Sequence, residues 1–300
     1  MLRAPEHQVP GHRAADGKLG PLVDGAGLFY KPLHGDDRGA HEVAFYSSFS
    51  SDLRVPHHVR AFFPGFHGTH ILPASDGSGP HPHLVLDDLA AGLRCPSVID
   101  LKIGARTWYP SAPDNYFHKC LKKDSTSTSL ALGFRVSGVR IHLGGDAGFW
   151  QPDRDVIRRF TAKDVWRTLR LFVSSNPASD SDPSDCAYAS PVYGGSNGVL
   201  AQLLELRAWF EDQTLFHFYS ASVLVLYETK EVEAGRAGGG GVRVKLVDFA
   251  HVMEGNGVID HNFLGGGFCS LIKFISEILT DPDECLTEPK KAQLSPENGS

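Results

Sequence analysis

Short apolar runs bounded by turn residues recur along most of the chain. Residues 27–32, 84–89 and 96–104 are rich in branched and aromatic side chains, a composition that predicts strands. Residues 216–227 and 242–248 predict two further strands, and the glycine-rich connection between them indicates a hairpin. These strands lie far apart in the sequence, so helices can occupy the intervals.

Helical spacing of apolar residues marks those intervals. Residues 39–49 fit a short helix, and Asp114 is placed to cap a helix that runs to about Lys123. The tetrapeptide Thr161-Ala-Lys-Asp164 has the form of a capping box and opens another helix. Residues 197–212 and 264–279 predict two later helices, with a strand at 133–142 that tolerates an irregularity at Gly138.

Segments poor in apolar residues predict connections and chain ends. We expect residues 1–26 to be a flexible N-terminus, 55–82 to form irregular connections, and 174–197 to be a mobile surface loop. The polar tail, residues 281–300, is predicted to be flexible. The organised chain then divides at a hinge after the strand at 84–89, into residues 27–89 and 90–280.

Composition narrows the class of protein. The chain has 300 residues, 41% of them hydrophobic, and a formal charge of −6, which argues against general nucleic-acid binding. A polyanion would therefore need a local basic patch. The odd count of five cysteines, without a C-x-x-C pair or a signal peptide, predicts reduced thiols inside a cell, in the nucleus or cytoplasm. We expect no membrane-spanning run, and a monomer is favoured.

Asp100 and Lys102 are the first candidate site residues. On a strand, positions i and i+2 share a face, so both side chains point to one side while Ile99, Leu101 and Ile103 point into the core. One substrate could touch both polar groups. The alternative for a lone D-x-K is a surface ion pair on an edge strand.

Asp248 is the second candidate, because it ends an apolar strand and is followed by Phe-Ala-His251. A single carboxylate at such a place suits Mg²⁺, which prefers oxygen and accepts one or two protein carboxylates. Turn capping is the alternative role for Asp248. His251 is evenly balanced between a phosphate ligand and a side chain satisfied by a nearby backbone carbonyl.

These motifs carry a resemblance to a known family. The run P-S-V-I-D-L-K-I-G at 96–104 matches the P-x-x-x-D-x-K-x-G signature of the inositol polyphosphate kinase family. V-D-F-A-H at 247–251, I-D-H-N at 259–262 and the segment around Ser270 resemble later family motifs in the same order. The short length and the W-Y-P that follows the signature are most similar to the plant multikinases of this family.

The resemblance implies an α+β fold that is a reduced relative of the protein kinase fold. It implies a small β-rich ATP lobe, a hinge at Asp87, Asp88 and Leu89, and a larger α/β lobe with a helical inositol-phosphate-binding segment. Lys31 would contact ATP phosphates and Glu42 would hold Lys31. Asp100 would be the catalytic carboxylate, Lys102 a catalytic and substrate-binding cation, and Asp248 an ATP-site residue that binds Mg²⁺. His251 would face a substrate phosphate.

The helix at 114–123 offers a local basic patch. Lys119, Lys122 and Lys123 are at i, i+3 and i+4, so they share a helix face, and Tyr116 lies one turn earlier. Alone, such a stripe is more often a solvated helix face. In a chain with the family signature, we expect it to bind substrate phosphates.

The resemblance therefore implies an ATP- and Mg²⁺-dependent multikinase. It would phosphorylate the 3- and 6-hydroxyls of inositol 1,4,5-trisphosphate and tetrakisphosphate to give the pentakisphosphate. The alternatives are an inositol trisphosphate 3-kinase, a hexakisphosphate kinase, or a non-catalytic scaffold that binds inositol phosphates. The retention of Lys31, Asp100, Lys102 and Asp248 argues against the scaffold.

Overall fold

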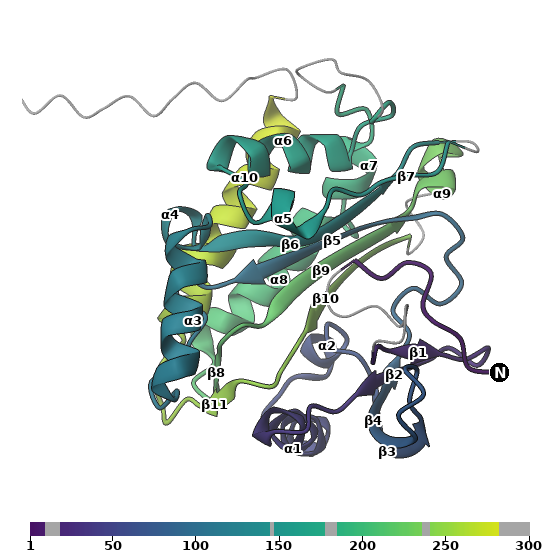
Figure 1. Cartoon of the computed structure of the whole chain (residues 1–300). Coiled ribbons are helices and arrows are strands. Elements are labelled where there is room, and N and C mark those ends of the chain that lie inside the picture. The colour runs from purple at the N-terminus through teal and green to yellow at the C-terminus, as the bar shows by residue number, and fades with distance from the viewer. Residues whose placement is uncertain (10–18, 145–146, 178–184, 236–240, 282–300) are drawn as a thin grey trace, which may run out of the picture.

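The computed structural model describes residues 1–9, 19–144, 147–177, 185–235 and 241–281. Its strands are β1 (Leu22–Val23), β2 (Leu28–Pro32), β3 (Phe66–Pro73), β4 (Pro80–Asp87), β5 (Pro96–Ile103), β6 (Phe134–His142), β7 (Phe149–Trp150), β8 (Phe216–Phe218), β9 (Ser222–Glu228), β10 (Val242–Val247) and β11 (Val252–Glu254). Its helices are α1 (Asp37–Ser51), α2 (His57–Arg60), α3 (Asp114–Ser125), α4 (Ser129–Leu132), α5 (Arg154–Ile157), α6 (Ala162–Phe172), α7 (Ala189–Tyr193), α8 (Val199–Asp212), α9 (Thr229–Glu233), the π-helical η2 (Asn262–Phe268) and α10 (Cys269–Thr280). The predicted α+β class is confirmed (Figure 1).

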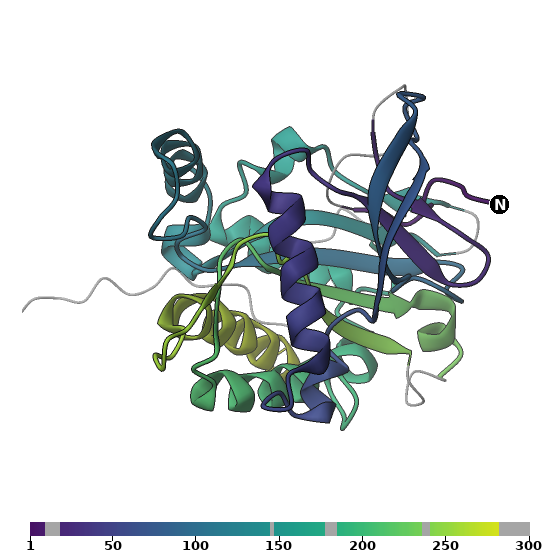
Figure 2. The same cartoon turned by 90° about the horizontal axis from the view of Figure 1, so that it is seen from below.

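The small lobe is an antiparallel sheet in the order β1-β2-β4-β3 beside helix α1. Asp36 caps α1 by accepting a hydrogen bond from the backbone N–H of Arg38, so the helix predicted at 39–49 starts slightly earlier. The rings of Phe45 and Phe49 in this helix stack with their centroids 5.1 Å apart. The ring of Phe45 also contacts that of Phe249 from the other lobe, with centroids 4.6 Å apart. The Phe45–Phe249 contact packs α1 against the large lobe, and the ring of Tyr46, stacked on that of Phe66 in β3 with centroids 5.6 Å apart, packs it against the small-lobe sheet; Figure 2 shows this purple helix beside the small-lobe strands.

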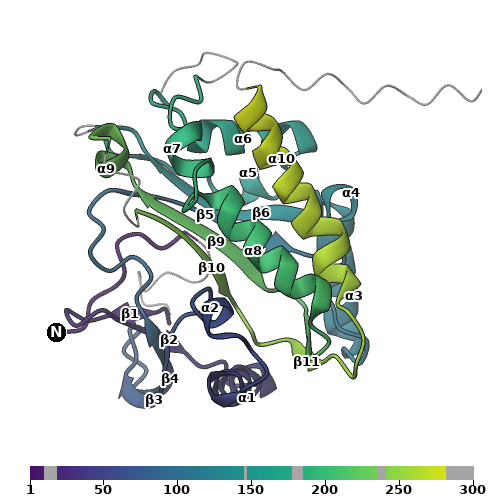
Figure 3. The same cartoon turned by 180° about the vertical axis from the view of Figure 1, so that it is seen from behind.

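The large lobe is built on a five-stranded sheet in the order β10-β9-β5-β6-β7. β5 lies at its centre, so the edge-strand alternative for Asp100 and Lys102 is wrong. Ile99, Leu101 and Ile103 are at most 1% exposed, and they belong to the main core with the helices that cover the back of the sheet. Figure 3 shows α8 and α10 lying across that face. Alternation leaves the intervening residues of β5 facing the small lobe.

Two predicted irregular segments contain regular structure. Residues 55–82 include α2 and the strand β3, which pairs with β4. Within the loop predicted at 174–197, α7 buries Val192 and Tyr193, whose hydroxyl donates to the carbonyl of Leu169 at 2.8 Å. Burial of large side chains therefore orders a stretch whose overall composition is polar. Residues 178–184 of that loop lie outside the described residues.

The strand predicted at 216–227 is divided in two. β8 pairs with β11, whereas β9 pairs with β10 as the predicted hairpin and with β5 on its other side. Ser220, between the two strands, has a φ of 57°, a left-handed conformation that turns the chain from one sheet to the other. The break matters for the site, as the carbonyl of Ser220 is turned toward Lys102.

The N-terminal residues were expected to be flexible, yet their described part is packed. The backbone of Arg3 exchanges two hydrogen bonds with Val23 of β1, and Val9 is buried. Residues 10–18 lie outside the described residues, as does nearly all of the tail at 281–300.

We expected no apolar run long enough to span a membrane, and this expectation is wrong. The helix Asn262–Thr280, which consists of η2 and α10, has 19 residues and is long and apolar enough to cross a bilayer, judged by length and composition alone. Phe268, Leu271, Ile275 and Ile278 of this helix are at most 1% exposed and belong to the main core of the large lobe. Its apolar character is thus accounted for by packing within the protein.

Candidate active site

A cavity of about 1400 Å³ lies between the two lobes. β2 and α1 contribute Lys31 and Glu42 from the small lobe, and β5 contributes Asp100 and Lys102 from the large lobe. Asp248 lies at its wall, directly after β10. Five predicted residues that are up to 217 positions apart in sequence therefore line one cavity.

Lys31 joins the lobes through two ion pairs. Its Nζ lies 2.8 Å from Oε1 of Glu42 and 2.9 Å from Oδ1 of Asp248. Burial acts to lower the pKa of Lys31, but the carboxylates of Asp248 and Glu42 outweigh it and raise that pKa. The Lys31–Glu42 ion pair that the resemblance implied is therefore present, and the side chain of Glu42 in this pair is buried.

Asp248 is held in an unusual backbone conformation. Its φ is 70°, a left-handed value that costs a non-glycine residue about 1 kcal/mol or more. Phe249, the next residue, is fully buried among the aromatic rings of α1, and its N–H donates to Oε1 of Glu42 at 3.3 Å. The buried ring fixes the backbone there, so the carboxylate of Asp248 is aimed at the cavity.

The charge of Asp248 is set by its cationic neighbours. Burial acts to raise its pKa, but Lys31 and Lys102 outweigh that effect and hold the pKa of Asp248 well below its usual range. Its side chain remains 41% exposed. Asp248 is thus an ionised carboxylate at neutral pH with an open side, which suits a metal ligand.

Asp100 has the opposite surroundings. Its side chain is fully buried, and neither carboxylate oxygen has a hydrogen-bond partner among the described residues. Burial raises the pKa of Asp100 to about 6, the ammonium of Lys102 and, more weakly, the nearby hydroxyl of Ser222 oppose the rise, and the charge of Asp248 adds to it. An unpaired carboxylate at a cavity wall with a pKa near neutrality can accept a proton from a hydroxyl group.

Lys102 lies between these two carboxylates. Its Nζ donates to the carbonyl oxygen of Ser220 at 2.6 Å and lies 3.5 Å from Oδ2 of Asp248. The hydroxyl of Ser220 in turn donates to the carbonyl of Thr107 at 2.9 Å. The turn between β8 and β9 therefore fixes the position of the Lys102 ammonium.

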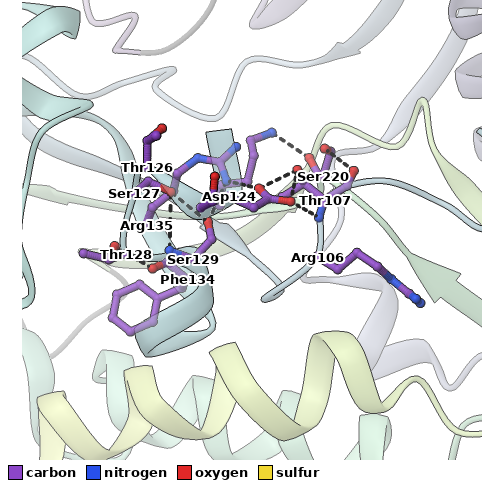
Figure 4. A network of polar contacts seen from close by, with 12 residues as sticks. Arg106, Thr107, Asp124, Thr126, Ser127, Thr128, Ser129, Phe134, Arg135 and Ser220 are labelled. Carbon is purple, nitrogen blue, oxygen red and sulfur yellow. Dashed lines mark hydrogen bonds and ion pairs between the residues drawn. The ribbon is translucent and has the colours of Figure 1, made fainter. Parts of the chain in front are cut away.

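Figure 4 shows a polar network that connects this turn to helix α3. Asp124, which is 1% exposed, accepts hydrogen bonds from the N–H and hydroxyl of Thr107 at 2.9 and 2.8 Å. Arg135 of β6 donates to Asp124 at 3.0 Å and to the hydroxyl of Ser129 at 2.7 Å. Arg135 lines the cavity and adds a cation that the sequence did not indicate, because Asp124, which orients it, lies on another element.

Helix α3 presents one face to the cavity, and it is not quite the predicted one. Tyr116, Lys119 and Lys123 line the cavity, whereas Lys122 does not. Spacings of three and four place these three residues on one stripe, and Lys122 falls one position to its side. Burial, followed by the charges of Arg135 and Lys119, lowers the pKa of Lys123, so cations are concentrated here. Pro113 is the N-cap, and Asp114 lies in the first turn.

His251 is part of an aromatic wall. Its ring stacks on Tyr109 at 5.2 Å and lies 4.8 Å from the ring of Tyr116. Burial, followed by the charges of Arg38 and Lys102, lowers its pKa to about 4, so the ring is neutral at pH 7. No backbone carbonyl among the described residues bonds its ring nitrogens. Of the two alternatives, the geometry favours a neutral donor at the cavity wall over a side chain satisfied by the backbone.

The predicted hinge also lines the cavity, but most of its backbone is already bonded. The N–H of Asp87 donates to Gly65, that of Asp88 donates to Gly27, and the carbonyl of Leu89 accepts from Arg243 at 2.7 Å. The carboxylate of Asp87 bonds His67 and the N–H of Gly65. Of the three hinge residues, Leu89 is the one whose N–H has no acceptor within the described structure. This N–H is therefore available to donate to a nucleotide base.

The glycine that ends the signature is explained by its backbone conformation and by a close neighbour. Gly104 has a φ of 111°, and a Cβ there would lie 2.9 Å from Nδ2 of Asn262. That amide bonds both backbone groups of Arg106, at 3.0 and 2.9 Å, which anchors the loop after β5. Ser270, by contrast, donates to the carbonyl of Gly266 within its own helix and does not line the cavity.

A lysine held by two carboxylates across two lobes, beside a buried carboxylate with no partner, is suited to phosphoryl transfer and defines a kinase-like phosphotransferase. The chain belongs to the inositol polyphosphate kinase family, whose sequence profile matches residues 83–276. This confirms the resemblance drawn from the signature at 96–104.

Individual relatives agree with this membership. The chain is 56% identical to the inositol polyphosphate multikinase beta of Arabidopsis thaliana, over 93% of this chain and 94% of that protein. It is 59% identical to an inositol polyphosphate multikinase of Oryza sativa, over 94% and 96%.

Solved structures support the fold. One from structural studies of an inositol phosphate multikinase covers 79% of this chain and 99% of its own, with 49% identity and a TM-score of 0.68. The inositol phosphate multikinase of S. cerevisiae, solved with ADP and Mn²⁺, covers 84% of this chain and 99% of its own at 20% identity, with a TM-score of 0.64.

Proposed function

We propose that this protein is an ATP- and Mg²⁺-dependent inositol polyphosphate multikinase. It phosphorylates the 3- and 6-hydroxyls of inositol 1,4,5-trisphosphate and tetrakisphosphate to give the pentakisphosphate. The observation that carries the proposal is the meeting of Lys31, Asp100, Lys102 and Asp248 in one cavity. The plant multikinases that match nearly the whole chain support the substrate class.

The residues divide the reaction among them. Asp100 accepts the proton of the attacking hydroxyl, as its carboxylate is unpaired and has a pKa of about 6. Lys102 and Lys31 offset the charge that develops on the transferred group. The resulting protonated Asp100 is neutral, which its buried place in β5 favours.

The residues present fit a metal that is shared with ATP phosphates. The described residues contain no group of three or more His, Cys, Asp or Glu side chains that could enclose a metal. Beside Lys31 and Lys102, Asp248 offers an ionised, 41% exposed carboxylate, and Mg²⁺ typically takes one or two carboxylates together with phosphate oxygens and water. When bound, the metal would neutralise phosphate charge at the Asp248 side of the cavity.

The substrate side of the cavity is basic although the whole chain is acidic. Lys119 and Lys123 from α3, Arg135 from β6 and Arg38 from α1 all line it. This local concentration of cations suits a sugar that carries several phosphates. His251 and Tyr116, whose ring centroids lie 4.8 Å apart, add neutral donors to the wall of the cavity.

Turnover with Mg·ATP and inositol 1,4,5-trisphosphate tests the reaction. We expect tetrakisphosphate and then pentakisphosphate, with positions assigned by NMR. Phosphorylation at the 3-hydroxyl alone would assign a 3-kinase, and pyrophosphate products would assign a hexakisphosphate kinase. Tight inositol phosphate binding without Mg·ATP binding in calorimetry would assign a scaffold. A wild-type rate for Lys102→Ala would overturn the proposed mechanism.

Two lysines of α3, one inside the cavity and one outside it, test the proposed substrate side of the cavity. Lys123→Ala should raise KM for the inositol phosphate about tenfold, because a charge-assisted contact contributes about 1.5 kcal/mol or more. Lys122→Ala is the control, since Lys122 lies on the same helix outside the cavity. Equal effects of the two variants on KM would show that α3 acts only through its net charge.

The proposal also includes an intracellular location, in the nucleus or cytoplasm, and a monomeric enzyme with no direct nucleic-acid partner. Fractionation of cells that express the tagged chain tests the location, sedimentation of the purified protein tests the monomer, and a gel-shift assay with DNA and RNA tests the absence of a nucleic-acid partner.

A further inference from the structure

The N-terminal residues 3–9 cross from the small lobe to the large lobe. At one end, Arg3 exchanges backbone hydrogen bonds with Val23 of β1 at 3.0 and 2.8 Å. Farther on, the carbonyl of Glu6 accepts from Nη1 of Arg140 in β6 at 2.9 Å. Figure 1 shows the purple N-terminal segment leaving β1 and rising to the large sheet. The hinge is therefore not the only link between the lobes in the described structure.

The segment ends with Val9 on an apolar patch. Val9 is buried against Val98 of β5 and Leu226 of β9, and Leu224, the hinge residue Leu89 and the following residues Ala90 and Leu93 pack around them. Residues 3 and 5–9 line the same cavity as the catalytic residues. We call residues 3–9 the N-terminal strap.

The apolar patch lies on the face of the sheet that carries the catalytic residues. Val98 pairs with Leu226, Asp100 with Leu224, and Lys102 with Ser222. Residues two apart on a strand share a face, so the patch continues the row of Lys102 and Asp100 toward the hinge. Val98 lies roughly 7 Å along β5 from Asp100, by the rise of about 3.4 Å per residue.

The sequence of charged and then apolar residues along this face of the sheet indicates how a nucleotide would be oriented in the cavity. Its phosphates belong with Lys31, Lys102 and Asp248, where the cations are concentrated. The flat apolar base then belongs at the other end, between the hinge and the patch under Val9, near the N–H of Leu89, which has no acceptor among the described residues. The cavity keeps about 1400 Å³ with the strap in place, more than the roughly 1000 Å³ upper range of ligand pockets, so the strap forms a wall and not a plug.

We propose that the N-terminal strap closes the nucleotide end of the cleft, and that Val9 makes an apolar contact with the purine base of ATP. This inference rests on the proposed use of ATP. It assigns nucleotide binding to a segment far from the family signature in sequence. The base contact is expected to act on nucleotide affinity alone, because the inositol phosphate binds at the opposite end of the row, near α3.

Substitutions at Val9 in the full chain test the strap. Val9→Ala should raise KM for ATP roughly fourfold, the effect of losing about one buried methylene contact. Val9→Asp should raise it at least about tenfold, by placing a carboxylate on the apolar patch. KM for inositol 1,4,5-trisphosphate should stay within error of the wild type, and the melting temperature of Val9→Ala should fall by a few degrees only, because Val9 is a buried contact outside the main core. Val258→Ala, at a valine that is 55% exposed, is the matched control.

The outcomes separate the strap from the proposed reaction. Unchanged KM for ATP in both Val9 variants, or equal changes in the two KM values, would overturn the strap proposal while leaving the kinase assignment intact. A lower KM for ATP would also overturn it, since the strap would then occupy the place of the base. Calorimetry of the wild-type chain with Mg·ADP is run alongside, and absence of binding there would overturn the proposed ATP dependence itself.

Discussion

Asp248 and Asp100 line the same cavity, yet they have opposite surroundings. Asp248 is paired with two ammonium groups, is partly open, and keeps its charge. Asp100 has no partner among the described residues, is fully buried, and has a pKa raised to about 6. The same side chain is therefore an ionised anchor at one place and a proton acceptor at the other.

The difference follows from where the chain places each residue. Asp248 leaves β10 in a left-handed conformation and meets Lys31 from the other lobe. Asp100 lies in the middle of the central strand, where the neighbouring strands exclude water on both sides. Two carboxylates whose pKa values are driven apart can hold a metal and move a proton in the same reaction. Substitutions that remove each charge in turn test this comparison.

The largest effect is expected from Asp248→Asn. The amide keeps the shape but loses the charge that balances Lys31 and Lys102 and that would bind the metal. We expect kcat to fall by at least about 10³-fold, the scale of losing electrostatic stabilisation at a reacting phosphate. Steady-state turnover at saturating Mg·ATP measures it, with Asp212→Asn, an exposed residue at the end of α8, as the control. A loss below tenfold would exclude Asp248 as the metal ligand.

Asp100→Asn should reduce kcat by about 10²- to 10³-fold, because proton acceptance contributes on that scale. KM for both substrates should change little if Asp100 acts mainly in the transition state. The measurement is again steady-state turnover. A large increase in KM for the inositol phosphate with unchanged kcat would instead make Asp100 a binding residue.

The same substitution should stabilise the fold. The pKa of Asp100 is about 6 when folded and near 3.9 when unfolded, so burial of its charge destabilises the protein as pH rises from about 4 through 6. Asp100→Asn removes that cost, and the free energy of unfolding at pH 7 should rise by up to roughly 3 kcal/mol. Denaturant unfolding at pH 4 and pH 7 tests it. The difference between wild type and variant should shrink at pH 4, and an equal difference at both pH values would contradict the raised pKa.

Local patterns allowed much of this site to be predicted. Alternation along 96–104 predicted that Asp100 and Lys102 share a face, since the period of a strand is fixed by backbone geometry. The Lys31–Glu42 pair was implied by the family resemblance and is present at 2.8 Å. The helix spacing predicted the α3 stripe, although Lys122 falls outside it: the stripe runs through Tyr116, Lys119 and Lys123, and Lys122 lies about 100° around the helix from Lys123.

What the sequence did not indicate depends on contacts between distant segments. The break at Ser220 is imposed by competition between two sheets for one apolar run. Arg135 becomes a site residue because Asp124, eleven positions away, orients it. The packing of Val9 depends on a patch formed by the hinge, β5 and β9, none of which can be recognised as its partner from the N-terminal sequence. Local propensity carries no information about such pairings.

The smallest predicted effect is a change in the rate with pH. If Asp100 must be ionised to accept a proton, kcat/KM should be about half its plateau near pH 6 and fall tenfold per unit below that. His251, with a pKa of about 4, is neutral throughout this range and adds no step. Phosphate groups of the substrates titrate near pH 6 as well, so the profile of wild type alone is ambiguous. The ratio of wild-type to Asp100→Asn rates cancels the substrate contribution. That ratio should decline below pH 6, because only the wild type loses its proton acceptor, and a ratio that stays constant between pH 5 and pH 8 would assign the titration to the phosphates and leave Asp100 with a positioning role.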